Sequence, residues 1–320
     1  MTPPRRAPVL PADLLARIAL VAGDREHGAS WLARECARIL AEAARPGAPA
    51  RVASRLRQLH DAARRLAAAR PSMAPVANTA ARIWLAAAHA ASLGVPAAGV
   101  LVAFRTEAER LDALWDDAAA AIGDAALPEL GGTLYTLSQS ATVERVLSRL
   151  VTERLAGGNP AEIIVDVSFP GFEGRATAGA LAAAGWSVTL IAGAACGIFL
   201  PRAAAVVCGA DSIRADGSVV NKVGTYPLAL AAQAAGVPFF VLSETLKIAA
   251  PSFALSFEQM PPRELAPDPV TGVTALNPYF DRTPAEYITA IFTERGRLTL
   301  ATLAAEITVA TTALAALDGQ

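Results

Sequence analysis

Cysteine is scarce in this 320-residue chain: the three present, Cys36, Cys196 and Cys208, are too widely spaced for a disulfide framework or a zinc site. Net charge is also small, −1 from 28 basic and 29 acidic residues, which gives no electrostatic basis for nucleic-acid binding. No uninterrupted run of about 18 apolar residues occurs, and the longest apolar segment, 186–210, is broken by glycines, a proline and an arginine. We therefore expect no metal, no nucleic acid and no membrane among its partners.

Other absences narrow the function further. The N-terminus has neither the apolar core nor the small-residue cleavage site of a secretion signal, so with so few cysteines a cytoplasmic location is expected. The phosphate-binding patterns GxxxxGK[ST] and GxGxxG do not occur, and we expect no cofactor. The three histidines lack metal-ligand spacing, and there is no Ser-His-Asp signature, which argues against zinc and serine hydrolases.

What the chain does contain falls into two halves with different periodicity. Residues 11–117 place apolar side chains at helical spacing almost throughout. After residue 127, short β-type runs alternate with helical stretches. Strands are expected at 132–138, 162–168, 187–192, 204–210 and 238–244, with helices at 142–157, 174–185 and 226–236. This alternation predicts an α/β fold with a doubly wound parallel sheet in the second half.

Polar side chains gather where several of these strands end. They are Ser138, Gln139 and Ser140, then Ser168, Asp211, Ser243 and Glu244. Ligands of doubly wound sheets bind at the carboxyl ends of the strands, so this pattern predicts a site there. Asp211 follows the apolar run "AVVCGA" and is a candidate general acid or base if partly desolvated. The plainer alternative is a turn-forming aspartate.

A second polar pair precedes the helix expected from residue 226. Asn221, Lys222 and the free backbone N–H groups of a helix start near Gly224 would suit an anion, most simply a phosphate. An ordinary helix start with a surface lysine explains the same residues. Lys247, after "SETL", is a further possible phosphate contact.

Taken in order, several stretches resemble one family. The longest is "GADSIRADGSVVNKVGTYPLALAAQAAGVPFFVLSETLKI", joined by "REHGASWLA", "ARPS", "TLSQSATVERVL", "FEGRATAGALAAAGWSVTLI" and "NPYFDRTPAEYITAIFTERG". This set resembles the family of ribose-1,5-bisphosphate isomerase, methylthioribose-1-phosphate isomerase and the alpha, beta and delta regulatory subunits of the eukaryotic translation initiation exchange factor. The resemblance covers nearly the whole chain.

The resemblance implies a helical N-terminal domain, 1–126, and a Rossmann-like domain, 127–320, through which the protein forms a homodimer or a higher homo-oligomer. It implies a phosphorylated sugar or nucleotide bound between the two domains. Asp211 takes the position of the aspartate that moves the substrate proton in the isomerases. The residues implied to bind the ligand are His27, Gly28, Ala29, Arg70, Ser140, Asn221, Lys222 and Lys247.

Three positions depart from the family pattern. Ser138 stands where the isomerases have a catalytic cysteine, and a neutral serine is a much weaker proton acceptor than a thiolate. His27 and Phe169 stand where arginines are usual. Two functions follow. One is a sugar-phosphate-binding protein with weak or no isomerase turnover; the other is an active aldose–ketose isomerase that uses Asp211 with a different base, such as Glu244 or His27.

Overall fold

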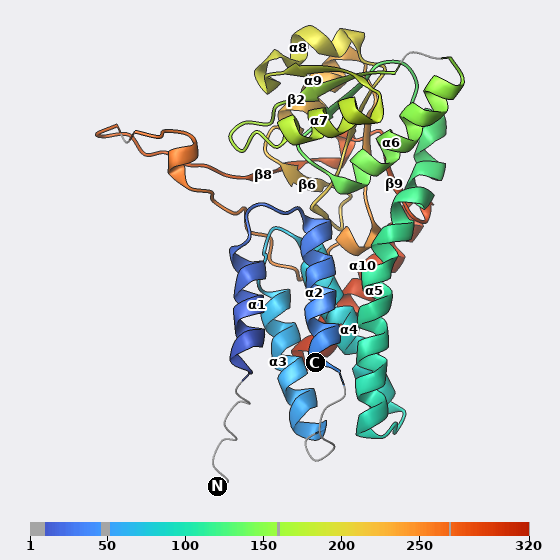
Figure 1. The fold of residues 1–320 in the computed structure, drawn as a ribbon, viewed down its shortest axis with the longest axis vertical. Coiled ribbons are helices and arrows are strands. Elements are labelled where there is room, and N and C mark those ends of the chain that lie inside the picture. Colours follow the sequence, from blue (N-terminus) through green and yellow to red (C-terminus); the bar gives the residue numbers. More distant parts are fainter. Residues whose placement is uncertain (1–9, 46–51, 159–160, 269, 320) are drawn as a thin grey trace.

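The computed structural model describes residues 10–45, 52–158, 161–268 and 270–319. A bundle of helices lies at one end of the molecule and a sheet covered by helices at the other (Figure 1). The bundle contains α1 (Ala12–Gly23), α2 (Ala29–Ala43), α3 (Val52–Ala67), α4 (Ala74–Ser92) and the first part of α5 (Ala97–Ala126). α4 lies at its centre, against α2, α3 and α5. Half of its buried residues are alanine, which lets the neighbouring helices approach closely.

The main sheet has seven strands in the order β10-β9-β7-β4-β1-β2-β3. Their bounds are Leu134–Leu137 (β1), Glu162–Asp166 (β2), Ser187–Ile191 (β3), Ala205–Cys208 (β4), Phe239–Leu242 (β7), Ala290–Thr293 (β9) and Gly296–Arg297 (β10). All of the pairings are parallel except that of β9 with β10. The helices between its successive parallel strands are α6 (Ala141–Ala156), α7 (Gly174–Ala184), α8 (Cys196–Phe199) and α9 (Thr225–Ala235). The predicted α/β fold is confirmed.

The strand order positions the site. From β1 the chain runs outward through β2 to β3, and then returns to the other side of β1 as β4. The order therefore reverses between β1 and β4, and a crevice forms at the carboxyl ends of two strands that diverge in this way. Ser138 follows β1 directly, and Asp211 comes three residues after the end of β4.

A second, antiparallel sheet was not predicted. It pairs β5 (Ser212–Ile213), β6 (Val219–Lys222) and β8 (Phe280–Thr283) in the order β5-β6-β8. The sequence analysis took 219–222 only as the approach to a helix. Instead, Asn221 and Lys222 are the last residues of a buried strand, and Asn221 lies opposite Asp281 of β8.

The last helix, α10 (Leu300–Asp318), returns to the helical bundle and packs along α4 and α3. Its buried Glu306 accepts a hydrogen bond of 2.8 Å from Arg82 of α4. Judged by length and composition alone, α10 is the one helix in the described part of the chain that could cross a membrane; its mean hydropathy is 1.7. Core helices of globular proteins pass the same test, so this is weak evidence of a span.

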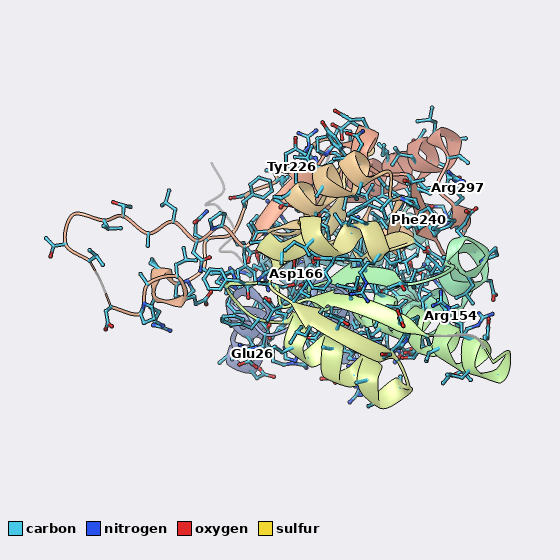
Figure 2. All side chains as sticks on the ribbon, turned by 90° about the horizontal axis from the view of Figure 1, so that it is seen from above. Glu26, Arg154, Asp166, Tyr226, Phe240 and Arg297 are labelled. Carbon is cyan, nitrogen blue, oxygen red and sulfur yellow. The ribbon has the colours of Figure 1, made fainter. Side chains whose placement is uncertain are left out.

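Between β7 and β8 the chain leaves the body of the molecule. Gln259 and Pro278 form an isolated antiparallel bridge, and the segment between them, which we call the arm, projects into solvent (Figures 1 and 2). The arm carries a short 3-10 helix, Pro262–Glu264. Its root lies beside the crevice between the bundle and the sheet.

Candidate functional site

A cavity of about 260 Å³ lies between the helical bundle and the carboxyl edge of the main sheet. Its wall brings together residues of the turn into α2, the turn before α4, the segments after β1, β4 and β7, the start of α7, β6, and the root of the arm. All of the catalytic and ligand-binding residues implied by the resemblance line it, namely His27, Gly28, Ala29, Arg70, Ser138, Ser140, Asp211, Asn221, Lys222 and Lys247. Of the other polar residues at strand ends, Gln139 lines it, but Ser168, Ser243 and Glu244 do not. Their roles in binding or catalysis stay predictions.

Ser138 lies on a strained turn at the exit of β1. Its φ of 59° is in the left-handed region, which costs a residue other than glycine about 1–3 kcal/mol and is typical of functional sites. Its backbone N–H donates to Ser168 Oγ at 2.6 Å. Among the described residues none exchanges a hydrogen bond with the Ser138 hydroxyl in this structure. Cys208 offers no substitute, because it is fully buried and its burial raises the pKa of the thiol.

Asp211 faces the cavity from the turn after β4. Its backbone N–H donates to the carbonyl of Val220 at 2.8 Å, while no described residue forms a hydrogen bond with its carboxyl. Burial raises the pKa of Asp211 to about 6, against the opposing effect of Lys247 and Arg70. A carboxyl group with such a pKa both holds and releases a proton near neutral pH, which suits a general acid or base.

The raised pKa of Asp211 predicts a pH-dependent stability effect. A folded-state pKa above the unfolded value means that the native state binds more protons, so the contribution of Asp211 to stability grows as pH falls from about 6 toward 4. Above pH 7 its buried charge destabilises the fold. We expect Asp211→Asn to raise the free energy of unfolding by about 1–3 kcal/mol at pH 7.5. Thermal denaturation of both proteins at pH 7.5 and 4.5 measures this, and a gain that does not shrink at pH 4.5 would contradict it.

Lys222 and Lys247 are both buried and each is paired with a glutamate. Lys222 Nζ lies 2.6 Å from Glu173 Oε1 and 3.2 Å from the centre of the Tyr279 ring. Burial lowers the pKa of Lys222, and the Glu173 carboxylate opposes that shift. Lys247 Nζ lies 3.0 Å from Glu244 Oε2. Both lysines therefore point at the cavity from fixed positions.

Glu244 is not placed to act as the replacement base. It is 2% exposed, accepts a hydrogen bond from the Thr142 hydroxyl and is not part of the cavity wall. Its carboxylate lies behind Lys247 and orients that ammonium group. His27 does line the cavity, but its Nδ1 is 2.8 Å from Asp24 Oδ2 and its ring stacks on Trp31, with the ring centres 3.7 Å apart.

The N-terminus of α9 does not supply the free N–H groups that the sequence predicted. Asp281 of β8 accepts hydrogen bonds from the N–H groups of Gly224, at 2.8 Å, and Tyr226, at 3.2 Å. Asn221 Nδ2 donates to Thr225 Oγ1 at 3.0 Å. That helix start is already capped by a carboxylate. Instead, α2 begins at the cavity wall after Gly28, with no side chain capping its first turn, and offers N–H groups to an anion.

Several cavity residues were missed by the sequence reading: Arg25, Trp31, Glu173, Glu258 and Tyr279. Arg25, Trp31, Glu173 and Tyr279 lie inside stretches that were quoted for the resemblance, so their position in the sequence was the only signal for them. Glu258 lies in none of these stretches. It binds Arg70 through both carboxylate oxygens, an arrangement seen only once the chain is folded.

Comparison with known proteins places the chain in a family. Residues 25–300 match the sequence profile of the initiation factor 2 subunit family. The chain belongs to that family. A 5-deoxyribose 1-phosphate isomerase of Moorella thermoacetica is 33% identical over 264 residues, which are 75% of this chain and 72% of that protein.

Other members of the initiation factor 2 subunit family resemble the chain over different lengths. A ribose 1,5-bisphosphate isomerase of Archaeoglobus fulgidus is 37% identical over 169 residues, 51% of this chain and 54% of its own. The chain thus spans about half the length of the curated relatives it matches first. The crystal structure of translation initiation factor eIF-2B from Pyrococcus horikoshii superposes with a TM-score of 0.73 at 27% identity, covering 90% of this chain and 98% of that one.

Proposed function

We propose that the chain is a cytosolic protein that binds a phosphorylated sugar in the cavity between bundle and sheet, with weak or no isomerase turnover. The observation that carries this is the convergence of Arg70, Lys222 and Lys247 on one cavity at the switch point of the sheet. Buried cations and an uncapped helix N-terminus favour a phosphoryl group. The names of the relatives, isomerases of sugar phosphates, support the same ligand class.

The alternative is an active aldose–ketose isomerase. It is favoured by Asp211, whose pKa of about 6 suits proton transfer. Ser138 is the argument against this alternative. An isomerase that moves a proton between adjacent sugar carbons needs a second acid–base group, and the Ser138 hydroxyl has no activating hydrogen-bond partner among the described residues.

A thermal-shift comparison tests the binding proposal. Ribose 1,5-bisphosphate, methylthioribose 1-phosphate, ribose and adenosine monophosphate are each added to the protein, because a ligand that binds only the native state raises the melting temperature. We expect the sugar phosphates to raise it and unphosphorylated ribose to leave it unchanged. Equal responses to ribose and its phosphates would refute a phosphoryl site.

We further propose that the chain forms a homo-oligomer through its sheet domain. Edge strand β3 and α8 leave large apolar side chains in solvent: Leu190 is 46% exposed and Ile198 is 74% exposed. Leu230 on α9, which packs against α8, is exposed as well. We expect a dimer or larger assembly at micromolar concentration, and a shift toward monomer in Ile198→Asp. Light scattering measures both, and a monomeric wild type would refute the proposal.

A further inference from the structure

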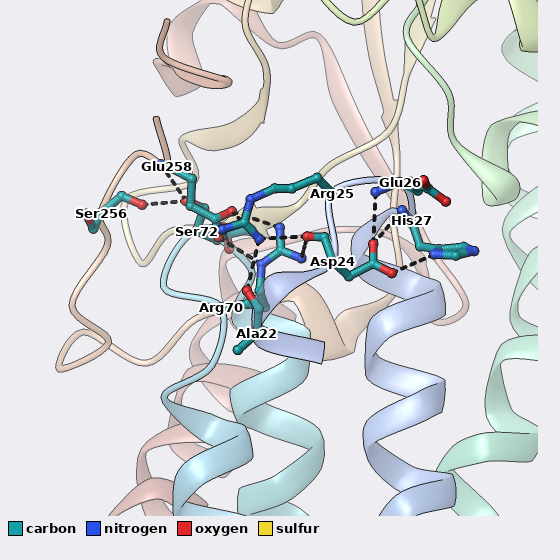
Figure 3. A network of polar contacts seen from close by, with 10 residues as sticks. Ala22, Asp24, Arg25, Glu26, His27, Arg70, Ser72, Ser256 and Glu258 are labelled. Carbon is teal, nitrogen blue, oxygen red and sulfur yellow. Dashed lines mark hydrogen bonds and ion pairs between the residues drawn. The ribbon is translucent and has the colours of Figure 1, made fainter. Parts of the chain in front are cut away.

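Arg70, the most completely buried arginine of the cavity, already holds an anion that belongs to the protein. Its Nε donates to Glu258 Oε1 at 3.0 Å and its Nη2 to Glu258 Oε2 at 2.8 Å, while Nη1 donates to the carbonyl of Asp24 at 2.9 Å. Figure 3 shows the guanidinium between these partners. Parallel pairing of an arginine fork with two carboxylate oxygens is also the way arginine binds a phosphoryl group. Glu258 therefore fills the place of a ligand oxygen pair.

Glu258 reaches Arg70 from a segment that is separate from the rest of the cavity wall. It lies one residue before the root of the arm. Backbone contacts hold this segment to the turn before α4: the N–H of Ser256 donates to the carbonyl of Pro71 at 3.3 Å, and the N–H of Glu258 to Ser72 Oγ at 3.2 Å. The backbone on either side of Glu258 is thus held by contacts that do not involve its carboxylate.

The glutamates paired with the cavity cations differ in position: Glu173, paired with Lys222, and Glu258 line the cavity, whereas Glu244 does not. Glu244 lies behind Lys247, outside the cavity wall, so a ligand does not compete with it. Glu258 lines the cavity and accepts hydrogen bonds from two of the donors of Arg70, Nε and Nη2. A second cation lies near the same carboxylate: Arg25 Nη1 is 4.0 Å from Glu258 Oε2. Removing the Glu258 carboxylate would therefore leave two arginines, Arg25 and Arg70, without this negative partner.

We propose that Glu258 is an internal competitor for Arg70 that lowers the affinity of the cavity for phosphoryl ligands. The proposal rests on the phosphoryl ligand of the proposed function. A phosphoryl group reaches Arg70 only by displacing the Glu258 carboxylate. Ligands with one phosphoryl group therefore bind first at Lys222 and Lys247, which line the cavity, and a second phosphoryl group binds Arg70 only by displacing Glu258.

Calorimetric titration of ribose 1,5-bisphosphate into wild type and Glu258→Gln tests this. The amide keeps the size of the side chain and one acceptor for Arg70 but removes the charge. We expect the dissociation constant to fall about tenfold, because a charged competitor has been removed. The unliganded variant should also melt at a lower temperature, since Arg70 loses its buried counter-charge. Asp268→Asn, which neutralises an exposed carboxylate on the same arm, should change neither value.

The outcomes separate the two proposals. Weaker binding by Glu258→Gln would mean that Glu258 positions Arg70 for the ligand, and equal binding would mean that it does not compete; both overturn the inference and leave the proposed function standing. Absence of binding by wild type and variant alike overturns both. If Glu258→Gln is unstable, Glu258→Asp is titrated in its place. Its shorter side chain withdraws the carboxylate from the Arg70 guanidinium, so the dissociation constant should fall by less than the tenfold expected for Glu258→Gln.

Discussion

Replacing Ser138 with cysteine should give the protein isomerase turnover on ribose 1,5-bisphosphate at least 10²-fold above that of the wild type, within the roughly 10²–10⁴-fold range that a positioned acid–base group contributes. Cysteine has nearly the size of serine, so it can occupy the left-handed turn at the same cost. Its thiol is the stronger proton acceptor of the two once ionised. Asp211, with a pKa of about 6, already supplies the partner.

Two companion variants make this assay decisive. Ser138→Ala should match the wild type, and adding Asp211→Asn to Ser138→Cys should remove the gain. Methylthioribose 1-phosphate is assayed in parallel to separate substrate choice from chemistry. Robust wild-type turnover that disappears in Asp211→Asn would instead establish an isomerase with a different base, and would contradict the view of a damaged proton-transfer site.

Replacing Lys222 with alanine should weaken binding of the same sugar bisphosphate by about one to two orders of magnitude. Charged hydrogen bonds contribute roughly 1.5–3 kcal/mol each, which corresponds to that range. The structure adds a second cause: without Lys222, the Glu173 carboxylate 2.6 Å away loses its cation and repels the phosphoryl group. Arg202→Ala, an exposed cation away from the cavity, is the matched control. Unchanged affinity of Lys222→Ala by calorimetry would refute this assignment.

The parallel sheet could be predicted because its strands are short apolar runs separated by helices, a local pattern. The expected strand at 204–210 and helix at 226–236, for example, match β4 and α9 to within two residues. The presence of Ser138 and Asp211 in the wall of one cavity was also predictable, since both follow strand ends and such ends share one edge of the sheet. The sheet could be predicted from the local periodicity of apolar residues, and the position of the site from the rule that parallel strands end at one edge of a sheet.

What escaped prediction depends on pairing between distant segments. β6 pairs with β5 across a short hairpin, for which Asp216-Gly217 was a local signal, but also with β8, which lies about 60 residues later and has no signal near 219–222. For the same reason the capping of α9 by Asp281 could not be foreseen. The pairing of Arg70 with Glu258 spans 188 residues, and that of Lys222 with Glu173 spans 49. The sequence around a loop glutamate does not indicate which cation it pairs with in the folded protein.

The central claim is that the cavity binds a phosphorylated sugar, and a crystal structure of the protein with ribose 1,5-bisphosphate tests it most directly. We predict a phosphoryl group within hydrogen-bonding distance of Lys222 Nζ, with the sugar carbons between Ser138 and Asp211. The same sugar bound elsewhere on the surface, or an empty cavity in crystals grown at a ligand concentration that saturates binding in solution, would contradict the claim.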